Sequence, residues 1–131
     1  IRHELKDQQW EGEYQFGYTN IWDSARRLER NMYRFGHKQC LSFGNGKPLQ
    51  LGRVGAILLD NEQDYQALSR MRSDGRDLSI LPWTEQQVFK QGYHYCPTLE
   101  LCELGTEKLP LVDEKPKYIP YPDLRTIDFT V

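Results

Sequence analysis

Short apolar segments separated by turn residues occupy the first half of the chain. Residues 39–43 form a short apolar run that predicts a strand, and residues 44–48 after it carry two glycines and a proline, which is turn chemistry. A second turn at residues 52–55 leads into the continuous apolar run of residues 56–59. A run of this kind predicts a strand that is buried on both faces.

A helical repeat follows this second strand. An apolar side chain recurs every third residue from Tyr65 to Met71, which predicts a helix with one apolar face. Asp60 or Asn61 is expected to cap the start of the helix, and Gly75 is expected to end it. The first half of the chain therefore favours strands and the middle favours a helix.

Two more helices are predicted from capping signals. Thr84 and Gln87 have the spacing of a capping box, which predicts a short helix through about Lys90. Thr98 is expected to cap another helix, which reaches about Gly105. These signals place three helices after the strands.

The outer segments are less regular. Residues 20–23 are expected to end a strand and residues 24–32 to form one or two helical turns, whereas residues 1–19 show no clear periodicity. Four prolines make residues 110–131 an irregular, proline-rich tail, in which residues 126–131 have the pattern of a terminal strand. Strands that alternate with helices predict an α/β fold, and 131 residues correspond to a single domain.

Composition excludes several classes of protein. The chain is 38% hydrophobic and 27% charged, which is typical of a soluble globular protein. The net charge of −2 argues against a nucleic-acid partner, and the sequence contains no apolar run of the length that a membrane span needs. The chain begins without Met or an apolar signal core, so we expect a piece of a longer reading frame.

Cysteine and histidine positions argue against a metal centre. The three cysteines contain no Cys-x-x-Cys pair, and their spacing suits neither zinc nor a disulfide framework. Reduced thiols in a cytoplasmic protein are the expectation. The three histidines are far apart in the sequence, so no metal cluster is predicted.

Nucleotide-binding motifs fail at Gly46-Lys47. A P-loop needs a glycine five residues before its second glycine and a hydroxyl residue after its lysine, but this chain has Leu41 and Pro48 there. Leu49 likewise occupies the position of the third glycine in a dinucleotide fingerprint. The glycine turn therefore requires another explanation.

One constellation matches the needs of pyridoxal phosphate chemistry. Such an enzyme needs a lysine for the Schiff base, an acid that keeps the pyridine nitrogen protonated, and hydroxyl or N–H groups for the phosphate. Asp23 and Ser42 each end a predicted strand, and Lys47 follows Ser42 in the glycine turn. All three can reach the same rim of a sheet. Taken alone, they also fit ordinary roles as a helix cap, a strand-end hydroxyl and a solvated loop lysine.

The order of motifs resembles the DegT/DnrJ-type sugar aminotransferases, a family of the fold-type-I pyridoxal-phosphate superfamily. That family has Ser-Phe-x-x-x-Lys, then Gly-x-Gly-Gly before an apolar strand, and a helix that ends near Arg-x-x-Gly-Arg. The corresponding segments here are residues 42–47, 52–55 and 72–76, with Asp23-Ser24-Ala25 upstream and Gly92-Tyr93-His94-Tyr95-Cys96 downstream. The resemblance covers residues 20–109.

The resemblance implies a fold and a set of cofactor contacts. Residues 1–131 would be a fragment of an aminotransferase large domain, a mixed sheet flanked by helices. Lys47 would form the Schiff base with pyridoxal 5'-phosphate, Asp23 would pair with the pyridinium, and Ser42 would bind the phosphate. His94 falls where the family has an Asn that reaches the cofactor of the neighbouring subunit, so a homodimer is expected.

The resemblance also implies a reaction. A glutamate-type donor would pass its amine through the cofactor to a keto sugar, one linked to a nucleotide, as in polysaccharide biosynthesis in the cytoplasm. Lys47, once released, would be the general base that moves the proton between Cα and C4′. The partners would be these small molecules and a second subunit, without nucleic acid or membrane. The family's sugar dehydratases replace the Schiff-base lysine, so Lys47 argues against that activity.

Departures from the family pattern support an alternative. Val54 replaces a glycine of Gly-x-Gly-Gly, and His94 and Cys96 replace an Asn and an Arg. The family's N-terminal third, with its phosphate-binding Gly-Thr turn, and its small C-terminal domain have no counterpart in this sequence. The alternative is a non-catalytic fragment or paralogue that serves only in assembly.

Overall fold

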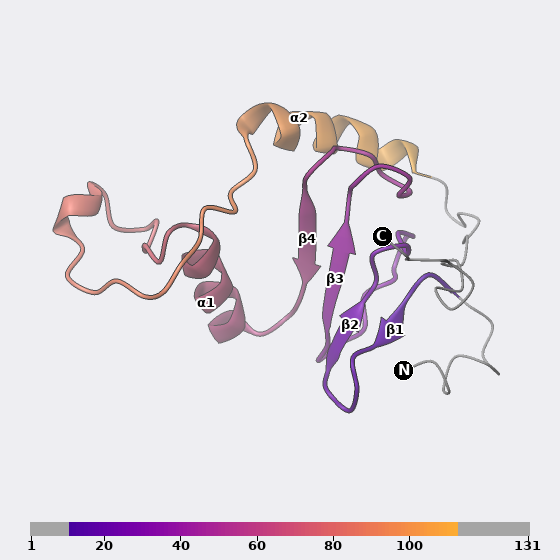
Figure 1. Cartoon of the computed structure of the whole chain (residues 1–131), viewed down its shortest axis with the longest axis horizontal. Helices are drawn as coiled ribbons and strands as arrows, with labels where there is room; N and C mark the ends of the chain where they lie inside the picture. The colour runs from indigo at the N-terminus through magenta and orange to yellow at the C-terminus, as the bar shows by residue number, and fades with distance from the viewer. Residues whose placement is uncertain (1–10, 113–131) are drawn as a thin grey trace, which may run out of the picture.

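Four strands and two α-helices make up the part of the chain that the structure, a computed structural model, describes, residues 11–112 (Figure 1). The strands are β1 (Tyr14–Gln15), β2 (Ile21–Asp23), β3 (Lys38–Ser42) and β4 (Gly55–Leu58). The helices are α1 (Glu62–Arg72) and α2 (Leu99–Lys108), with short 3₁₀ turns at η1 (Trp83–Glu85) and η2 (Leu109–Leu111). The arrangement is of the α/β type, as predicted, although the four described strands all precede the two α-helices in the sequence instead of alternating with them.

The sheet is mixed, with the strand order β1-β2-β3-β4. The central pair, β2 and β3, is parallel, and Asp23 lies opposite Cys40. The two outer pairs are antiparallel, with Tyr14 opposite Asp23 and Ser42 opposite Gly55. The carboxyl ends of β2 and β3 therefore lie together at one end of the sheet. We call this end, where the central strands stop, the edge of the sheet that carries the site residues.

The strands predicted at residues 20–23, 39–43 and 56–59 are found, but the burial predicted for one of them is wrong. β2 and β3 match the segments predicted at residues 20–23 and 39–43 to within one residue at each end. The prediction that residues 56–59 are buried on both faces is wrong, because β4 is an edge strand of the described sheet and the side chain of Ile57 is 45% exposed. β1 lies in a stretch where the sequence shows no periodicity.

The connection between β2 and β3 is not helical. The helical turns expected at residues 24–32 are replaced by isolated turns, and Asn31 has a φ of 60°. Gln39, which is fully buried, accepts a hydrogen bond from the backbone N–H of Arg34 and donates one to the carbonyl of Met32. These bonds compete with the helical i→i−4 ladder and fix the connection against one face of the sheet.

A buried carboxylate organises that face. Glu13 accepts hydrogen bonds from Arg27 at 2.6 Å, Arg34 at 2.5 Å and Ser24 at 2.9 Å. Gln39 also donates to it, at 3.2 Å. Burial by itself would raise the pKa of Glu13, but the hydrogen bonds from Arg34 and Ser24 and the charges of both arginines outweigh burial and lower it.

Few hydrophobic side chains are buried in the described part of the chain. Among residues 11–112, the buried hydrophobic side chains are Met32, Leu41, Leu49 and Leu51. The buried polar side chains of the same residues are Glu13, Ser24 and Gln39 in the sheet part of the chain, and Ser73 and Gln86 after α1. The described fold thus depends on satisfied polar groups to an unusual degree, because buried polar groups cost free energy unless they are hydrogen bonded.

Helix α1 begins and ends as its sequence predicts. The side chain of Asn61 accepts from the N–H of Asp64 at 2.9 Å, which confirms the cap at that position. The helix ends at Arg72, and Gly75, with a φ of 78°, donates its N–H to the carbonyl of Arg70. A left-handed glycine after the last turn is the expected way to end a helix.

The chain returns along the end of α1 instead of forming the helix predicted at residues 84–90. Only η1 is helical there. Gln86, not Gln87, is the anchor, because its side chain bonds both backbone groups of Asp77 at 2.9 Å. Residues 90–95 then run past the helix end, where Gly92 lies so close that an added Cβ would be 1.8 Å from the backbone nitrogen of Gly75.

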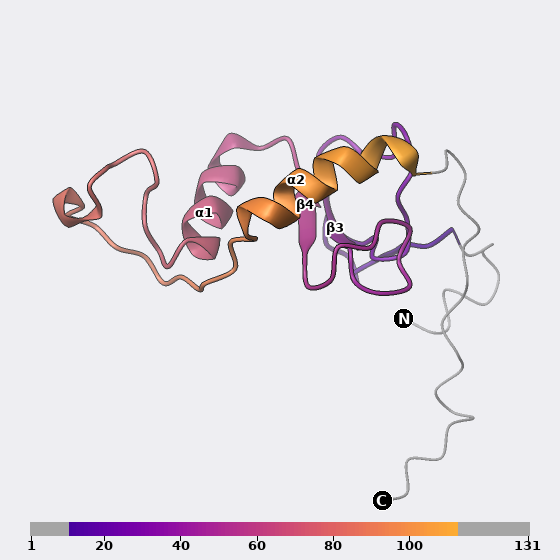
Figure 2. The same cartoon turned by 90° about the horizontal axis from the view of Figure 1, so that it is seen from above.

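Helix α2 lies across the carboxyl end of β3, beside the loop that joins β3 to β4 (Figures 1 and 2). Thr98 is its N-cap residue, as predicted, although its side chain makes no capping hydrogen bond, and the helix continues to Lys108, three residues past the expected Gly105. A Cβ added at Gly105 would be 3.0 Å from the side chain of Leu51. The loop and the helix therefore pack together at this edge.

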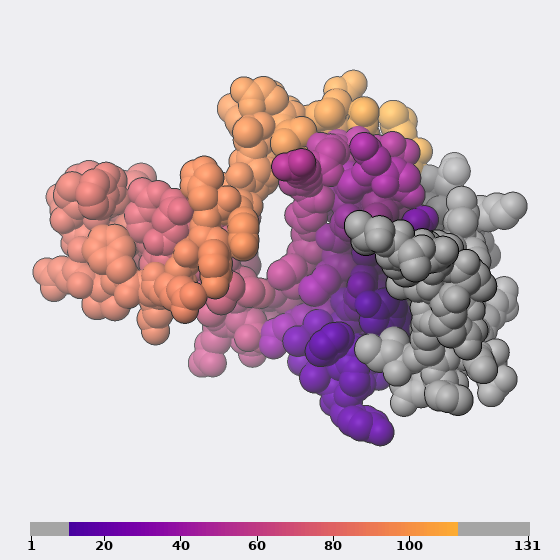
Figure 3. Space-filling view, in the orientation of Figure 1, coloured from indigo at the N-terminus to yellow at the C-terminus, as the bar shows by residue number. Residues whose placement is uncertain are grey.

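Large apolar side chains remain at the surface. Eighteen of them are exposed within residues 11–112, and eleven of these lie in residues 65–99: Tyr65, Met71, Leu78, Ile80, Leu81, Trp83, Val88, Phe89, Tyr93, Tyr95 and Leu99. Figure 3 shows an opening between this part of the chain and the sheet. None of the helices described is long and apolar enough to cross a membrane. The predicted terminal strand at residues 126–131 and most of the proline-rich tail lie outside the described residues.

Candidate functional site

Two of the predicted cofactor residues lie on one face and at one edge of the sheet. Asp23 is opposite Cys40 in the parallel pair, and Ser42 follows Cys40 by two residues along β3. Side chains opposite one another, and side chains two apart on a strand, project from the same face. Asp23 and Ser42 are therefore neighbours at the carboxyl ends of β2 and β3, which is where open α/β sheets bind ligands.

The contacts of Asp23 differ from those of a helix cap. One carboxylate oxygen accepts from the N–H of Ala25 at 2.9 Å, which closes a turn, and no helix follows in this part of the described chain. The other oxygen accepts from the hydroxyl of Tyr14, also at 2.9 Å. A carboxylate has about four lone-pair positions, so two such bonds leave Asp23 able to accept another donor.

The pKa of Cys40 is raised by its surroundings, which include the charge of Asp23. Burial is the main cause that raises the pKa of the Cys40 thiol, and the negative charge of Asp23 raises it further. Both causes act on the face that carries Tyr14, Asp23 and Ser42. The thiol is half-buried and forms no disulfide, and its raised pKa favours the protonated form. It therefore behaves as a small apolar side chain on this face of the sheet.

Ser42 and Lys47 are joined by a closed loop. The hydroxyl of Ser42 accepts from the N–H of Gly44 at 3.4 Å, a long and weak bond. The loop after it is closed by backbone bonds from Phe43 to Val54 at 2.8 Å and from Leu51 to Phe43 at 2.7 Å. Its side chains Leu49 and Leu51 are buried, so the loop that carries the half-buried Lys47 is anchored at the same edge of the sheet.

His94 lies apart from these three residues. It is on the segment that returns along α1, where it forms an isolated bridge with Ser73. Its side chain is 85% exposed, and Nδ1 is 3.3 Å from Asp74. A hydrogen bond from Arg76 is the first cause that lowers the pKa of Asp74, and one from His94 is the second. The structure brings Asp23, Ser42 and the Lys47 loop to one edge, and it does not bring His94 to them within one described chain.

Tyr14 is the residue that the sequence did not single out. It enters the site because β1 and β2 form a hairpin in which Tyr14 is opposite Asp23. Gly17, with a φ of 57°, and Asn20 lie between the two strands and are residues typical of turns. Those two residues were the available signal for the hairpin, and hence for the pairing of Tyr14 with Asp23.

Residues 11–112 contain no group of three or more histidine, cysteine or acidic side chains that could hold a metal ion. The three cysteines are all free. Scans of the chain against protein-family models, curated proteins and solved structures found no match. The features of this chain that bear on function are therefore its own motifs and the geometry of the sheet edge.

Proposed function

We propose that this chain carries the cofactor-lysine region of a pyridoxal-phosphate-dependent aminotransferase. The observation that supports the proposal is the juxtaposition of Asp23 and Ser42 on one face at the carboxyl ends of two parallel strands, followed by Lys47 on an anchored loop. An acid, a hydroxyl and an amine are the three kinds of group that this cofactor needs. The resemblance of residues 20–109 to the DegT/DnrJ-type family extends the proposal to a keto sugar acceptor, nucleotide-linked, and a glutamate-type donor.

The side chains at this edge fit the cofactor. Asp23 retains lone pairs for a pyridinium N–H, and the hydrogen bond from Tyr14 fixes the direction of its carboxylate. Among residues 11–112, the hydroxyl of Ser42 accepts one weak bond, so it is available to donate to a phosphate oxygen. The bound cofactor would supply an electron sink for the substrate carbanion, and Lys47 would supply the covalent attachment and later move the proton at Cα.

An assembly role is the second candidate, and the exposed apolar residues favour it. Side chains such as Leu81 at 75% exposure and Val88 at 63% lie on the part of the chain that makes little contact with the sheet. Exposed apolar surface of this kind marks an interaction site. We propose a homodimer on this ground and on the family resemblance, with the exposed His94 directed to the second subunit.

Absorbance titration with pyridoxal phosphate separates the two candidates. An enzyme is expected to develop a visible band with wild-type chain and none with Lys47→Ala, while a matched Lys108→Ala change on α2 leaves the band intact. Asp23→Asn is expected to keep the band but to abolish amine transfer, because a neutral amide cannot keep the pyridine nitrogen protonated. A chain that develops no band, yet sediments as a dimer, would support the assembly role instead.

A further inference from the structure

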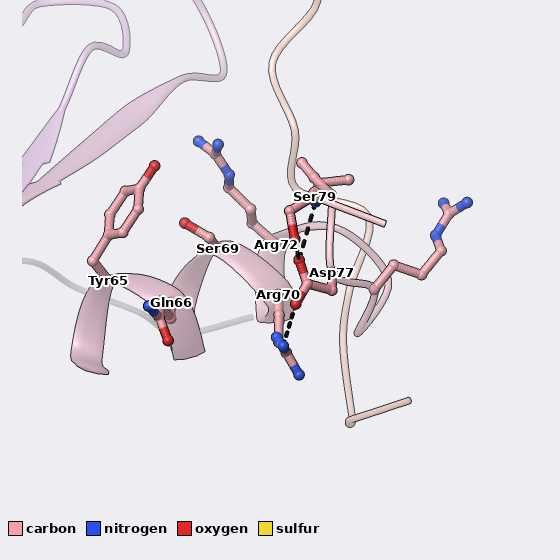
Figure 4. A pocket seen from close by; sticks show the side chains of 9 residues that line it. Tyr65, Gln66, Ser69, Arg70, Arg72, Asp77 and Ser79 are labelled. Carbon is pink, nitrogen blue, oxygen red and sulfur yellow. Dashed lines mark hydrogen bonds and ion pairs between the residues drawn. The ribbon is translucent and has the colours of Figure 1, made fainter. Parts of the chain in front are cut away.

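A pocket lies between α1 and the turn that follows it, away from the Lys47 loop (Figure 4). Its volume is about 320 Å³, close to the small end of the roughly 300–1,000 Å³ typical of ligand sites. The pocket, called here the Arg72 pocket, is lined by Tyr65, Gln66, Ser69, Arg70, Arg72, Arg76, Asp77, Leu78 and Ser79. It is concave, it combines apolar and polar groups, and the cofactor proposal makes no use of it.

Three polar side chains of the Arg72 pocket share one side of α1. Tyr65, Ser69 and Arg72 are separated by four and three residues, which places them on one helical face. Figure 4 shows their hydroxyl and guanidinium ends extending to the same side of the helix, away from the ion pair of Arg70 with Asp77. One face thus presents two hydroxyl groups and one cation.

The lining is positively charged. It contains three arginines and one aspartate, so its formal charge is +2 (three minus one). Arg70 is neutralised by Asp77, and Arg76 pairs with Asp74 at 2.6 Å. In the described part of the chain Arg72 has no ion pair, so its guanidinium remains as an uncompensated charge beside Tyr65 and Ser69.

Helix stabilisation does not account for Arg72. Basic residues in a last turn generally compensate the negative carbonyl end of a helix. Here the carbonyls of Met71 and Arg72 already accept N–H groups from Tyr93 at 2.6 Å and from Tyr95 at 2.9 Å. The helix end is therefore satisfied by backbone donors, and its negative field near the pocket is reduced.

We infer that the Arg72 pocket binds a small phosphate monoester. Arg72 is placed to form a charge-assisted fork with the phosphate oxygens, and the Tyr65 and Ser69 hydroxyls supply further donors. The Tyr65 ring, 54% exposed, and Leu78, 53% exposed, offer apolar surface to the organic part of such a ligand. This inference is independent of the proposed function, because none of these residues belongs to the Lys47 edge.

Calorimetric titration of the full chain with phenyl phosphate and with inorganic phosphate tests the inference. We expect saturable binding of both, with phenyl phosphate the tighter because only its ring can pack against the Tyr65 ring and Leu78. Arg72→Gln should weaken phenyl phosphate binding about tenfold, the loss typical of one charged hydrogen-bond partner. Lys108→Gln removes the same charge from α2 and should leave the affinity unchanged.

Two further variants keep the test independent of folding and of the cofactor. Tyr65→Phe retains the ring and should weaken binding less than Arg72→Gln does. Lys47→Ala should leave the affinity for phenyl phosphate unchanged, since a loss there would place the anion at the cofactor site. Absence of saturable binding, or an equal loss in Arg72→Gln and Lys108→Gln, would overturn the inference.

Discussion

The sheet region, residues 11–59, and the α1 region, residues 60–97, are built on different principles. In the sheet region a buried carboxylate, Glu13, binds two arginines and a serine, and all four described buried hydrophobic side chains lie there. In the α1 region the buried side chains described are Ser73 and Gln86, and both are polar. Backbone bonds between α1 and the returning segment, such as Tyr93 to Met71 at 2.6 Å, hold that region together.

This difference teaches where each kind of function is expected. In the sheet region, the hydrogen bonds of Glu13 to Ser24, to two arginines and to Gln39 connect β3 with the segment between β2 and β3. The α1 region places its large apolar side chains on its surface, which suits contact with another surface. The proposed cofactor site therefore lies in the first region, and the Arg72 pocket and the proposed assembly surface lie in the second.

Removal of the Glu13 charge should have the largest effect on stability among the changes that distinguish the two regions. Glu13→Gln breaks buried pairs with Arg27 and Arg34, and loss of one partner of a buried pair costs about 3 kcal/mol at the low end of the usual range. The low end applies because the Arg34 side chain is 42% exposed. Urea unfolding followed by circular dichroism measures the change, with the surface variant Glu103→Gln as the control. Equal stability of the two variants would contradict the role of the network.

The substitution Gly92→Ala should loosen the packing of the α1 region without affecting the sheet region. The added Cβ would lie 1.8 Å from the nitrogen of Gly75, so the backbones must separate, at an expected cost of about 2 kcal/mol for overpacking. Hydrogen exchange of residues 71–76 and 90–95 should accelerate, while exchange in β2 and β3 stays unchanged. Gly44→Ala is the matched control, because its Cβ meets no atom closer than 3.5 Å. Faster exchange throughout the sheet would show that the two regions are not independent.

Acidification should weaken the sheet region through Glu13, with the smallest effect of the three. The folded-state pKa of Glu13 is lowered below its ordinary value of 4.5, so its contribution is present above that pH and is lost as pH falls through the folded pKa. The unfolding midpoint should be flat near neutrality and drop in acid. Glu13→Gln should show a shallower drop, and an unchanged acid profile in that variant would assign the drop to other carboxylates.

Sequence patterns predicted the positions of strands and of helix α1 better than they predicted the contacts around them. Asn61, Gly75 and the strand at residues 38–42 were accessible because caps, turns and short apolar runs are local signals. The connection at residues 24–32 and the segment at residues 84–90 were wrongly predicted as helical. The side chain of Gln39 binds the backbone of Met32 and Arg34, and the side chain of Gln86 binds the backbone of Asp77, five to nine residues away in the sequence. Local propensity contains no information about such partners.

The candidate site was predictable in part for the same reason. Asp23, Ser42 and Lys47 were singled out by their places at strand ends and in a glycine turn, and the register of β2 and β3 brings the first two together. Tyr14 depended on a hairpin whose strand is two residues long, too short for a periodic signal. Arg72 was visible only as part of a helix end, and its surplus charge appears once the partners of Arg70 and Arg76 are known.

Borohydride reduction of the full chain with pyridoxal phosphate, followed by peptide mapping, tests the central claim most directly. Reduction converts a Schiff base into a stable amine, so the label marks the lysine that held the cofactor. The proposal predicts a single labelled peptide containing Lys47, and no label in Lys47→Ala. Label on another lysine, such as Lys38 or Lys90, or spread over several lysines in proportion to their exposure, would contradict it.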